Sequence, residues 1–406
     1  MGDTDGGERS QGNSNVKAIT RSLGRGLALL CLSLVANVAQ AGDATTPAAP
    51  PAPVTALPAG HELNPTDIES FFDGLVPLQI ESNDIAGATI AIVKDGKLIF
   101  AKGYGFADMK TRAPVSPETT LFRVGSVTKL FTWTSVMQLV EQGKLDLDRP
   151  LSEYLDKPYL PDEPRHLKIT ARMVLSHTTG FPNWRKDGLR SGNRLTMLFE
   201  PGTRFDYSGE GFTYLQRVIE HITGEPFERY VKRALFEPLG ITTASYVWED
   251  GFEKLAAASR PDSGETPPNH SLYRNANVAY SRYCSPMEYA LFLVEILKQD
   301  RSAAHSLSAR SIDAMPTRAT KTEGLQPVVR RGGQRPESVY YGLGWIIDAT
   351  PSGDRIHHGG SNGAKGTGFR CYCEFDPKAG SGIVVMTNAA GGRELWQELI
   401  AKVSEP

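Results

Sequence analysis

Short apolar runs mark the two ends of the folded part of the chain. Residues 88–108 contain two such runs joined at Asp95-Gly96, a dipeptide that favours a tight turn between paired strands. Further β-rich runs separated by Gly, Pro and Asp follow near the other end, at residues 340–348, 355–360, 368–377 and 382–390. The pattern therefore predicts a hairpin early in the chain and several strands late in it.

Between these strands, apolar residues recur at the spacing of α-helices. The predicted helical segments are 126–142, 170–180, 211–223, 226–240 and 285–299, and residues 392–403 close the chain as a further helix. Strands at both ends with helices between them predict an α+β fold. In this α/β sandwich, one antiparallel sheet from both chain ends is flanked by helices, and a mainly helical region is inserted.

The start of the chain has the features of an export signal. Basic residues up to Arg25 precede an apolar run from Gly26 to Ala41, which is short for a membrane span. The run ends in Ala39-Gln40-Ala41, a small-x-small cleavage site. We therefore predict export with cleavage near Ala41, a periplasmic or secreted mature protein, and no stable membrane span after processing.

The predicted organisation is a signal peptide at residues 1–41, a Pro- and Ala-rich spacer at 42–61 and one folded domain at 62–406. A lipid anchor at Cys31 is disfavoured because the large Leu30 stands where a small residue is needed. The acidic, Gly-rich opening before the basic residues is unusual for a leader and leaves a misplaced start codon open.

The composition gives no sign of a polyanionic partner. The chain has a net charge of -2, and removal of residues 1–41, with four basic and three acidic residues, leaves 40 basic and 43 acidic residues, a net charge of -3. Since there is no basic stripe, no paired-cysteine zinc spacing and no phosphate-binding loop, we expect no nucleic-acid partner and no cofactor. The cysteines after residue 41 are Cys284, Cys371 and Cys373, an odd number, and we interpret all three as structural.

The segment FRVGSVTKLFT places Ser126 at the start of a predicted helix and Lys129 one turn later. In the ordinary interpretation, Ser126 caps the helix. In the alternative, residues i and i+3 share a helix face, so the Lys129 amine reaches the Ser126 hydroxyl. A lysine in an apolar pocket, here beside Phe122, Leu130 and Phe131, loses its proton near neutral pH and can activate that hydroxyl as a nucleophile.

Two later segments add candidate site residues. Tyr207 lies just before a predicted helix in RFDYSGEGFTYL and is a candidate for catalysis, with a buried structural tyrosine as the ordinary alternative. HHGGSNG, from His357 to Gly363, has glycines that let backbone amides approach a ligand. The adjacent histidines would point to opposite faces of a strand and the chain has no HExxH motif, so we expect no metal site.

Together these segments resemble the serine β-lactamase and D-alanyl-D-alanine peptidase superfamily, in the branch of class C β-lactamases, related peptidases and esterases. The likeness runs from about residue 62 to about residue 400. Three motifs come in the family's order: SxxK as Ser126 to Lys129, YxN near Tyr207 to Gly209, and K/HxG as His358 to Gly360. The phrases VLSHTTG, FEPGTRFDYS, FEPLGI and YGLGW are also similar to the family. The resemblance implies a β-lactamase/transpeptidase-like fold and a serine hydrolase that works through a covalent acyl-enzyme.

The resemblance also implies residue roles. Ser126 would be the acylated nucleophile, and Lys129 and Tyr207 would share the transfer of its proton. The backbone N–H groups of Ser126 and Ser361 would hold the oxyanion. The remaining expected substrate-binding positions are His358, in place of the usual lysine, Gly360 and Gly209.

One departure from the family affects the expected substrate. Gly209 stands where the family usually has an asparagine, whose carboxamide binds the amide side chain of β-lactams and peptides. Loss of that group weakens recognition of acylamino substrates, so we expect an esterase-like hydrolase of small esters or amides. The alternative is a penicillin-binding D-Ala-D-Ala carboxypeptidase or a β-lactamase that takes a β-lactam as substrate.

Other classes of protein are disfavoured. Residues 359–363 match the GxSxG elbow of α/β-hydrolases, but no histidine follows Ser361 as that fold requires. KTEG at residues 321–324 imitates the K/HxG motif without a flanking strand. A non-catalytic cell-envelope binding or sensor protein is the hypothesis from another class, and the intact serine, lysine and tyrosine argue against it.

Overall fold

The computed structural model describes residues 64–184, 195–258 and 272–403, apart from positions 299, 301, 303–305, 323, 326, 331, 332, 352 and 364–367. The predicted signal peptide at 1–41 and spacer at 42–61 lie outside the described residues. Contacts within the chain group Glu62–Pro406 into one compact unit. Within the described ranges, no helix is both long enough and apolar enough to cross a bilayer.

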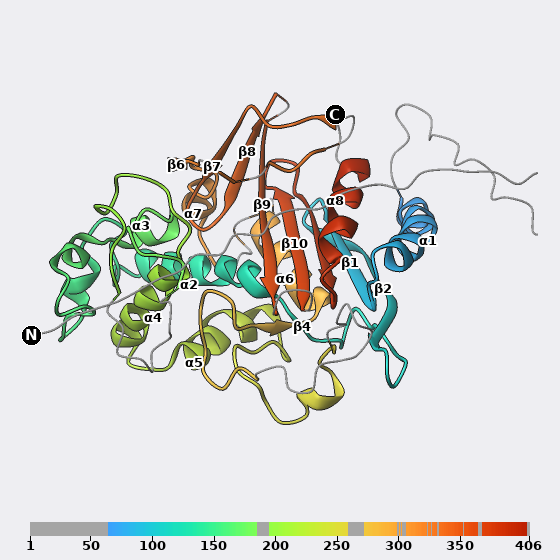
Figure 1. Cartoon of the computed structure of the whole chain (residues 1–406), viewed down its shortest axis with the longest axis horizontal. Coiled ribbons are helices and arrows are strands. Elements are labelled where there is room, and N and C mark those ends of the chain that lie inside the picture. Colours follow the sequence, from blue (N-terminus) through green and yellow to red (C-terminus); the bar gives the residue numbers. More distant parts are fainter. Residues whose placement is uncertain are drawn as a thin grey trace, which may run out of the picture. The chain divides into compact units, whose positions relative to one another are not determined.

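A nine-stranded antiparallel sheet forms the centre of this unit (Figure 1). Its order is β3-β2-β1-β11-β10-β9-β8-β7-β6. The strands are β1 (Gly87–Lys94), β2 (Lys97–Asp108), β3 (Ala113–Pro114), β6 (Thr320–Lys321), β7 (Ser338–Tyr341), β8 (Ile346–Thr350), β9 (Gly353–Asn362), β10 (Phe369–Asp376) and β11 (Ser381–Thr387). The hairpin of β1 and β2 pairs with the last strand, with Ala88 opposite Thr387, which confirms the prediction of one sheet built from both chain ends.

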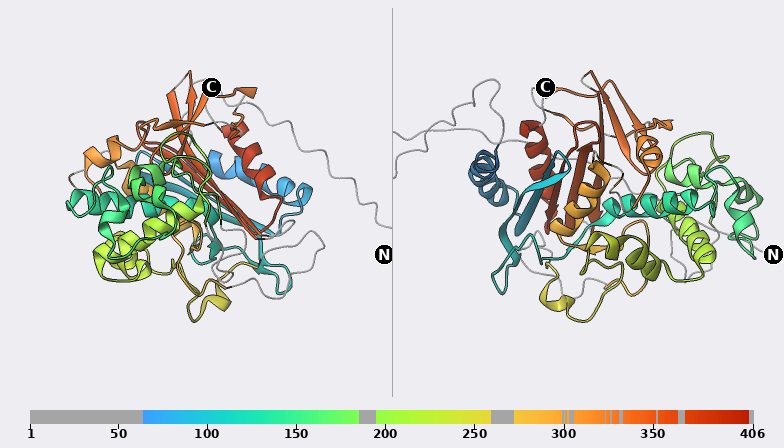
Figure 2. Two further views of the ribbon diagram at one scale, coloured as in Figure 1. Left: turned by 60° about the vertical axis from the view of Figure 1, so that its left-hand side comes forward. Right: turned by 180° about the vertical axis from the view of Figure 1, so that it is seen from behind.

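Helices cover both faces of this sheet, as the sandwich prediction requires (Figure 2). One face is covered by α1 (Pro65–Ser82) and α8 (Gly392–Val403). The other is covered by α2 (Lys129–Glu141), α6 (Pro286–Leu297) and the inserted region, which holds α3 (Ala171–Leu175), α4 (Gly209–Thr223) and α5 (Phe227–Val231). The helix α7 (Ala309–Asp313) follows α6, and a small ribbon of β4 (Phe122–Arg123) and β5 (Tyr283–Cys284) ties the start of α2 to the start of α6.

Strand alternation lets one sheet serve two cores. On β10, Cys371 and Cys373 point to the inserted region, whereas Tyr372 points to α8 and stacks on Trp396 with 4.2 Å between ring centroids. Cys371, Cys373 and Cys284 are buried and unpaired. Burial raises the pKa of the Cys284 thiol to about 12 and raises the pKa of the other two thiols as well.

Several helices differ from the predicted ones. The predicted helix 126–142 opens with a 3-10 turn, η1 (Gly125–Thr128), and α-helical geometry begins only at Lys129. The predicted helix 170–180 ends at Leu175, because His177 has a φ of +55°, outside the helical region. The predicted helix 226–240 continues beyond α5 as a π-helical turn (Lys232–Phe236) and a 3-10 turn, η5 (Glu237–Leu239), since Pro238 has no N–H to donate.

Several elements are absent from the predictions, among them α1 and β6. The helix α1 is capped by Asn64, whose side chain accepts from Asp67 N at 3.0 Å, and its buried residues Ile68, Phe72 and Val76 recur every four positions. The strand β6 contains Lys321 of the KTEG sequence, so the prediction that no strand flanks this sequence is wrong. However, β7 and β8 separate β6 from β9, which carries the HHGGSN sequence.

The turn η1 packs directly against the backbone of β9. Gly125 has a φ of +61°, and a Cβ at this position would lie 2.8 Å from both the N and the O atoms of Ser361. A Cβ at Gly360 would lie 2.0 Å from the carbonyl oxygen of Val124. Because Cβ atoms do not approach backbone so closely, both positions must be glycine for the two backbones to touch.

Gly360→Ala should disrupt this contact, whereas Gly359→Ala should not, because a Cβ at Gly359 meets no atom within 4 Å. We expect Gly360→Ala to lower the free energy of unfolding by about 1–3 kcal/mol or more. We expect Gly359→Ala to change it by about 0.5 kcal/mol or less. Urea unfolding of both variants measures the difference, and equal effects would contradict the close contact.

Candidate active site

Ser126 lies in the middle of η1, where it is partly exposed. Neither η1 nor α2 is capped by a side-chain hydrogen bond, and Thr128 takes the N-cap position of α2. The interpretation of Ser126 as a helix cap is therefore wrong. Its hydroxyl is instead available to the lysine one turn later.

The Lys129 amine lies beside that hydroxyl and is itself closed to water. Its Nζ donates to Ser126 Oγ at 3.2 Å, as the i, i+3 spacing predicts, and to the carbonyl oxygen of Ala279 at 2.9 Å. The lysine is fully buried, and burial lowers the pKa of its amine to about 7. A large share of the molecules therefore carries a neutral amine at neutral pH.

The rings around this amine come from α4 and the residues just before it. Nζ lies 4.9 Å from the ring centroid of Tyr207 and 5.1 Å from that of Phe212. Phe131, which was expected beside the amine, instead has its ring 3.3 Å from the guanidinium carbon of Arg282. Residues i and i+2 of a helix point in different directions, so Phe131 cannot share the pocket of Lys129.

Tyr207 reaches the same place from just before α4. Its hydroxyl is buried and has no hydrogen-bond partner of good geometry among the described residues. Burial raises the pKa of this hydroxyl well above its usual value, and the nearby Ser126 hydroxyl opposes part of the rise. The tyrosine is therefore protonated at neutral pH and does not rest as an anion.

His177 is absent from the predicted site, yet its ring stacks on Tyr207 with 4.1 Å between centroids and 30° between planes. The backbone N–H of Ser208 donates to its Nδ1 at 3.0 Å, which places the ring proton on Nε2. Burial, together with the charge of Lys129, lowers the pKa of His177 well below its usual value. This neutral ring orients Tyr207, and the signal for it in the sequence is its place in VLSHTTG.

His358 lines the same cluster from β9 and is also neutral. Its Nδ1 donates to the carbonyl oxygen of Gly359 at 2.7 Å, so its Nε2 accepts from the Tyr341 hydroxyl at 2.8 Å. Burial and the charge of Lys129 lower the pKa of His358 to about 3. His357 points to the other face of the sheet, as the strand period predicts, and its Nε2 lies 3.3 Å from an Asp348 carboxylate oxygen.

The other expected site residues surround the Ser126 turn. Ser361 is exposed, and its backbone touches Gly125, so the backbone of β9 lies immediately beside the turn that carries Ser126. Gly360 makes that contact possible, as described above. Gly209 is the first residue of α4 and lies under the indole of Trp184. The residues that meet at the centre are Ser126, Lys129, Tyr207, His177 and His358.

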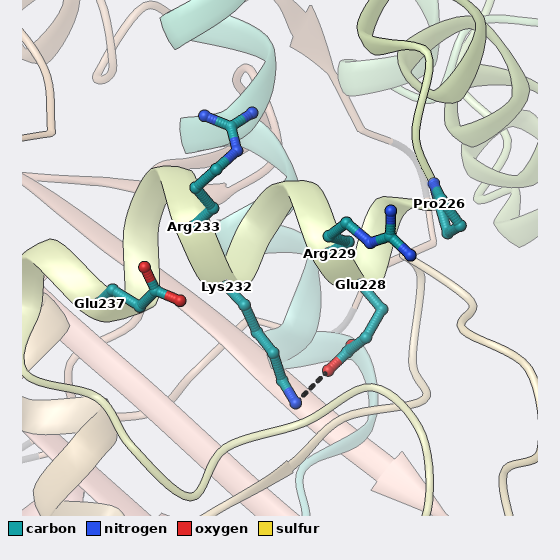
Figure 3. A pocket seen from close by; sticks show the side chains of 6 residues that line it. All are labelled: Pro226, Glu228, Arg229, Lys232, Arg233 and Glu237. Carbon is teal, nitrogen blue, oxygen red and sulfur yellow. Dashed lines mark ion pairs between the residues drawn. The ribbon is translucent and has the colours of Figure 1, made fainter.

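Outside this cluster, the described residues bear on two other kinds of site, a metal centre and a surface hollow. Within the described ranges, no group of three or more His, Cys, Asp or Glu side chains could hold a metal ion. A hollow on α5 and the turns after it is lined by Pro226, Glu228, Arg229, Lys232, Arg233 and Glu237 (Figure 3). Lys232 pairs with Glu228 at 3.1 Å and also with Glu249. None of the lining side chains is a hydroxyl or a thiol, so this hollow offers no nucleophile.

Comparisons with known proteins agree with this geometry. Residues 72–404 match the model of the Beta-lactamase family. Protein flp of Staphylococcus aureus (strain MRSA252) is 27% identical over 214 residues, which are 50% of this chain and 43% of flp. The putative penicillin-binding protein PbpX of Bacillus subtilis (strain 168) is 33% identical over 167 residues, 39% of this chain and 41% of that protein. The chain thus spans less than half the length of these curated relatives.

Solved structures extend the likeness to the whole fold. The octameric penicillin-binding protein homologue of Pyrococcus abyssi superposes with a TM-score of 0.68 and 25% identity, over 82% of this chain and 76% of that one. The β-lactamase/D-alanine carboxypeptidase of Pseudomonas syringae gives a TM-score of 0.66 and 21% identity, over 84% of this chain and 99% of that one. These likenesses confirm the β-lactamase/transpeptidase-like fold. Since the family model covers well over half of the sequence, the chain belongs to the Beta-lactamase family.

Proposed function

We propose that the protein is a serine hydrolase that cleaves small esters or amides through a covalent acyl-enzyme on Ser126. One observation carries the proposal. The Ser126 hydroxyl, a fully buried Lys129 amine and the Tyr207 ring meet at one point, although Tyr207 comes from a distant part of the chain. A non-catalytic binding or sensor protein would not need a desolvated amine beside a hydroxyl, since burial of an amine is costly.

In the proposed first step, neutral Lys129 takes the Ser126 proton while Oγ forms a bond to the substrate carbonyl carbon. The backbone N–H groups of Ser126 and Ser361 would hold the oxyanion, an interaction commonly worth about a hundredfold in rate or more. As the tetrahedral species collapses, the bond to the leaving group breaks, and that group takes a proton from Lys129 or through the Tyr207 hydroxyl. Water then hydrolyses the ester on Ser126 by the same sequence in reverse.

The proposed substrates are esters in preference to β-lactams. Gly209 provides no carboxamide for an acylamino side chain, and His358 is neutral, so the site has no fixed cation there to attract a substrate carboxylate. Some relatives are named for penicillin binding or D-alanine carboxypeptidase activity, and they support a second candidate function. In that alternative, the same acylation of Ser126 serves a β-lactam or an acyl-D-Ala-D-Ala peptide.

Export is part of the proposal and rests on the leader-like residues up to Ala41. We expect the full-length chain, expressed in a bacterium with two membranes, to be recovered by osmotic shock with Gly42 as its first residue. Intact-protein mass spectrometry reads that terminus. A protein that keeps residues 1–41 would contradict cleavage at this site.

The proposed nucleophile can be identified by covalent labelling. A fluorophosphonate probe should form one adduct, on the peptide that contains Ser126, because this hydroxyl has an amine within hydrogen-bond distance. Peptide mass spectrometry locates the adduct, and Ser126→Ala serves as the unlabelled control. An adduct on Ser361 would support the GxSxG elbow instead, and a folded protein that takes no label would support a binding protein.

The pH dependence of labelling tests Lys129. The amine acts as a base only when it is neutral, and its pKa is about 7, so the neutral fraction rises as the pH rises through 7. We expect the labelling rate to fall about tenfold per pH unit below pH 6 and to level off above pH 8. Lys129→Arg, which keeps the charge but cannot deprotonate, should lose labelling at every pH. A labelling rate that keeps rising toward pH 10 would show that the pKa of the Lys129 amine is not lowered.

A further inference from the structure

Trp184 occupies the space that a side chain at position 209 would need. A Cβ on Gly209 would lie 2.2 Å from Cη2 and 2.3 Å from Cζ2 of the Trp184 indole. These distances are far shorter than any van der Waals contact, so a residue larger than glycine at position 209 would have to displace the indole. At the position where the resemblance described above implies an asparagine carboxamide, this chain therefore presents an indole.

Two hydrogen bonds fix the segment that carries this indole on the start of α4. Gly209 N donates to Asn183 Oδ1 at 3.0 Å, and Glu210 N donates to the carbonyl oxygen of Asn183 at 3.0 Å. The first N–H groups of a helix have no partner within the helix, and Asn183 supplies two of those partners here. Asn183 is therefore held at the start of α4 through its side chain and its backbone carbonyl, and Trp184 follows it directly in the chain.

The indole is the first member of an aromatic wall, which we define as Trp184, Tyr280 and Tyr273. Trp184 meets Tyr280 edge to face, with 5.3 Å between centroids, and Tyr280 meets Tyr273 at 5.5 Å. The Tyr273 hydroxyl accepts a hydrogen bond from Asn362 Nδ2. The wall thus runs from the start of α4, just after Tyr207, to the end of β9, which contributes Ser361 to the proposed site.

The wall is also tied to the proposed base. Ala279, the residue before Tyr280, accepts the hydrogen bond from Lys129 Nζ at 2.9 Å. Trp184 nevertheless remains 41% exposed, so part of the indole is open to a bound molecule. Because the indole lies on Gly209, two residues after Tyr207, its exposed part is an apolar surface near the proposed reaction centre that the acyl part of a substrate can use.

We propose that Trp184 and Gly209 together select acyl groups that are apolar and carry no amide on the carbon next to the ester carbonyl. Such an amide would lose its water against the indole without a carboxamide to pair with, which is unfavourable. An aliphatic or aromatic acyl chain would gain contact with the same surface. The inference rests on the proposed acyl transfer at Ser126 and names its substrate class as small aliphatic and aromatic carboxylic esters.

A double-mutant cycle tests the proposal with the wild type, Trp184→Ala, Gly209→Asn and the double variant. For each protein, kcat/KM is measured with p-nitrophenyl butyrate and with nitrocefin, a cephalosporin that carries an acylamino side chain. In the double variant, the ratio of kcat/KM for the ester to that for nitrocefin should fall at least about tenfold. Gly209→Asn alone should change this ratio less, because the indole still takes the space of the new side chain.

Controls separate failure of this inference from failure of the proposed function. Leu78→Ala removes an apolar side chain that is 61% exposed on α1 and should leave the ratio unchanged. Fluorophosphonate labelling of Ser126 in the wild type reports the proposed function, and a wild type without this label would overturn that function and the inference with it. A double variant that labels at the wild-type rate with a ratio within twofold of the wild type would overturn the inference alone.

If the double variant does not fold, Trp184→Ala alone still tests the proposal. Loss of the apolar surface should lower the preference for p-nitrophenyl butyrate over p-nitrophenyl acetate at least about threefold, since the longer chain loses contact with the indole. An unchanged preference in this variant would contradict a role of Trp184 in selecting the acyl group.

Discussion

The contact between two backbones, η1 and β9, is the constraint on which the site depends. The sheet contributes β9 from the late part of the chain, and the inserted helical region begins directly after η1. Only glycine at positions 125 and 360 lets the two chains approach without side chains between them. The Ser126 hydroxyl and the backbone of Ser361 are consequently neighbours by virtue of main-chain packing, which is more rigid than any pair of side chains.

Burial of one amine then determines the protonation of its surroundings. Lys129 has no exposed surface, and its amine pairs with a hydroxyl and a backbone carbonyl rather than with a carboxylate, so its charged form is disfavoured. The two histidines near it, His177 and His358, are also neutral, because burial and the lysine charge both oppose a second cation. Tyr207 keeps its proton for the same reason of burial. The cluster therefore has groups that can exchange protons and no permanently charged side chain. Such a site suits a reaction in which charge appears only in the transition state.

The parts of the structure that follow from local pattern could be predicted from the sequence. Asp95-Gly96 marks the hairpin of β1 and β2, and the Ser126 to Lys129 spacing brings the two side chains within hydrogen-bond distance. The motif residues Ser126, Lys129, Tyr207 and His358 lie at one place in the structure. The residues that line the site, Phe212, His177 and Trp184, could not be predicted. They reach the site through tertiary packing, which the helical and strand periodicity of the sequence does not reveal. The start of α2 at Lys129 could not be predicted either, because the apolar pattern continues through the 3-10 turn that begins at Gly125, whose φ is positive.

The three buried thiols have a consequence for the handling of the protein. Cys284, Cys371 and Cys373 are closed to solvent and have raised pKa values, so almost no reactive thiolate exists in the folded state. These three thiols are therefore protected from oxidation for as long as the sheet stays closed. Alkylation of these three thiols by a maleimide therefore requires opening of the core. The rate of alkylation measures how often the core opens, and no engineered label is needed.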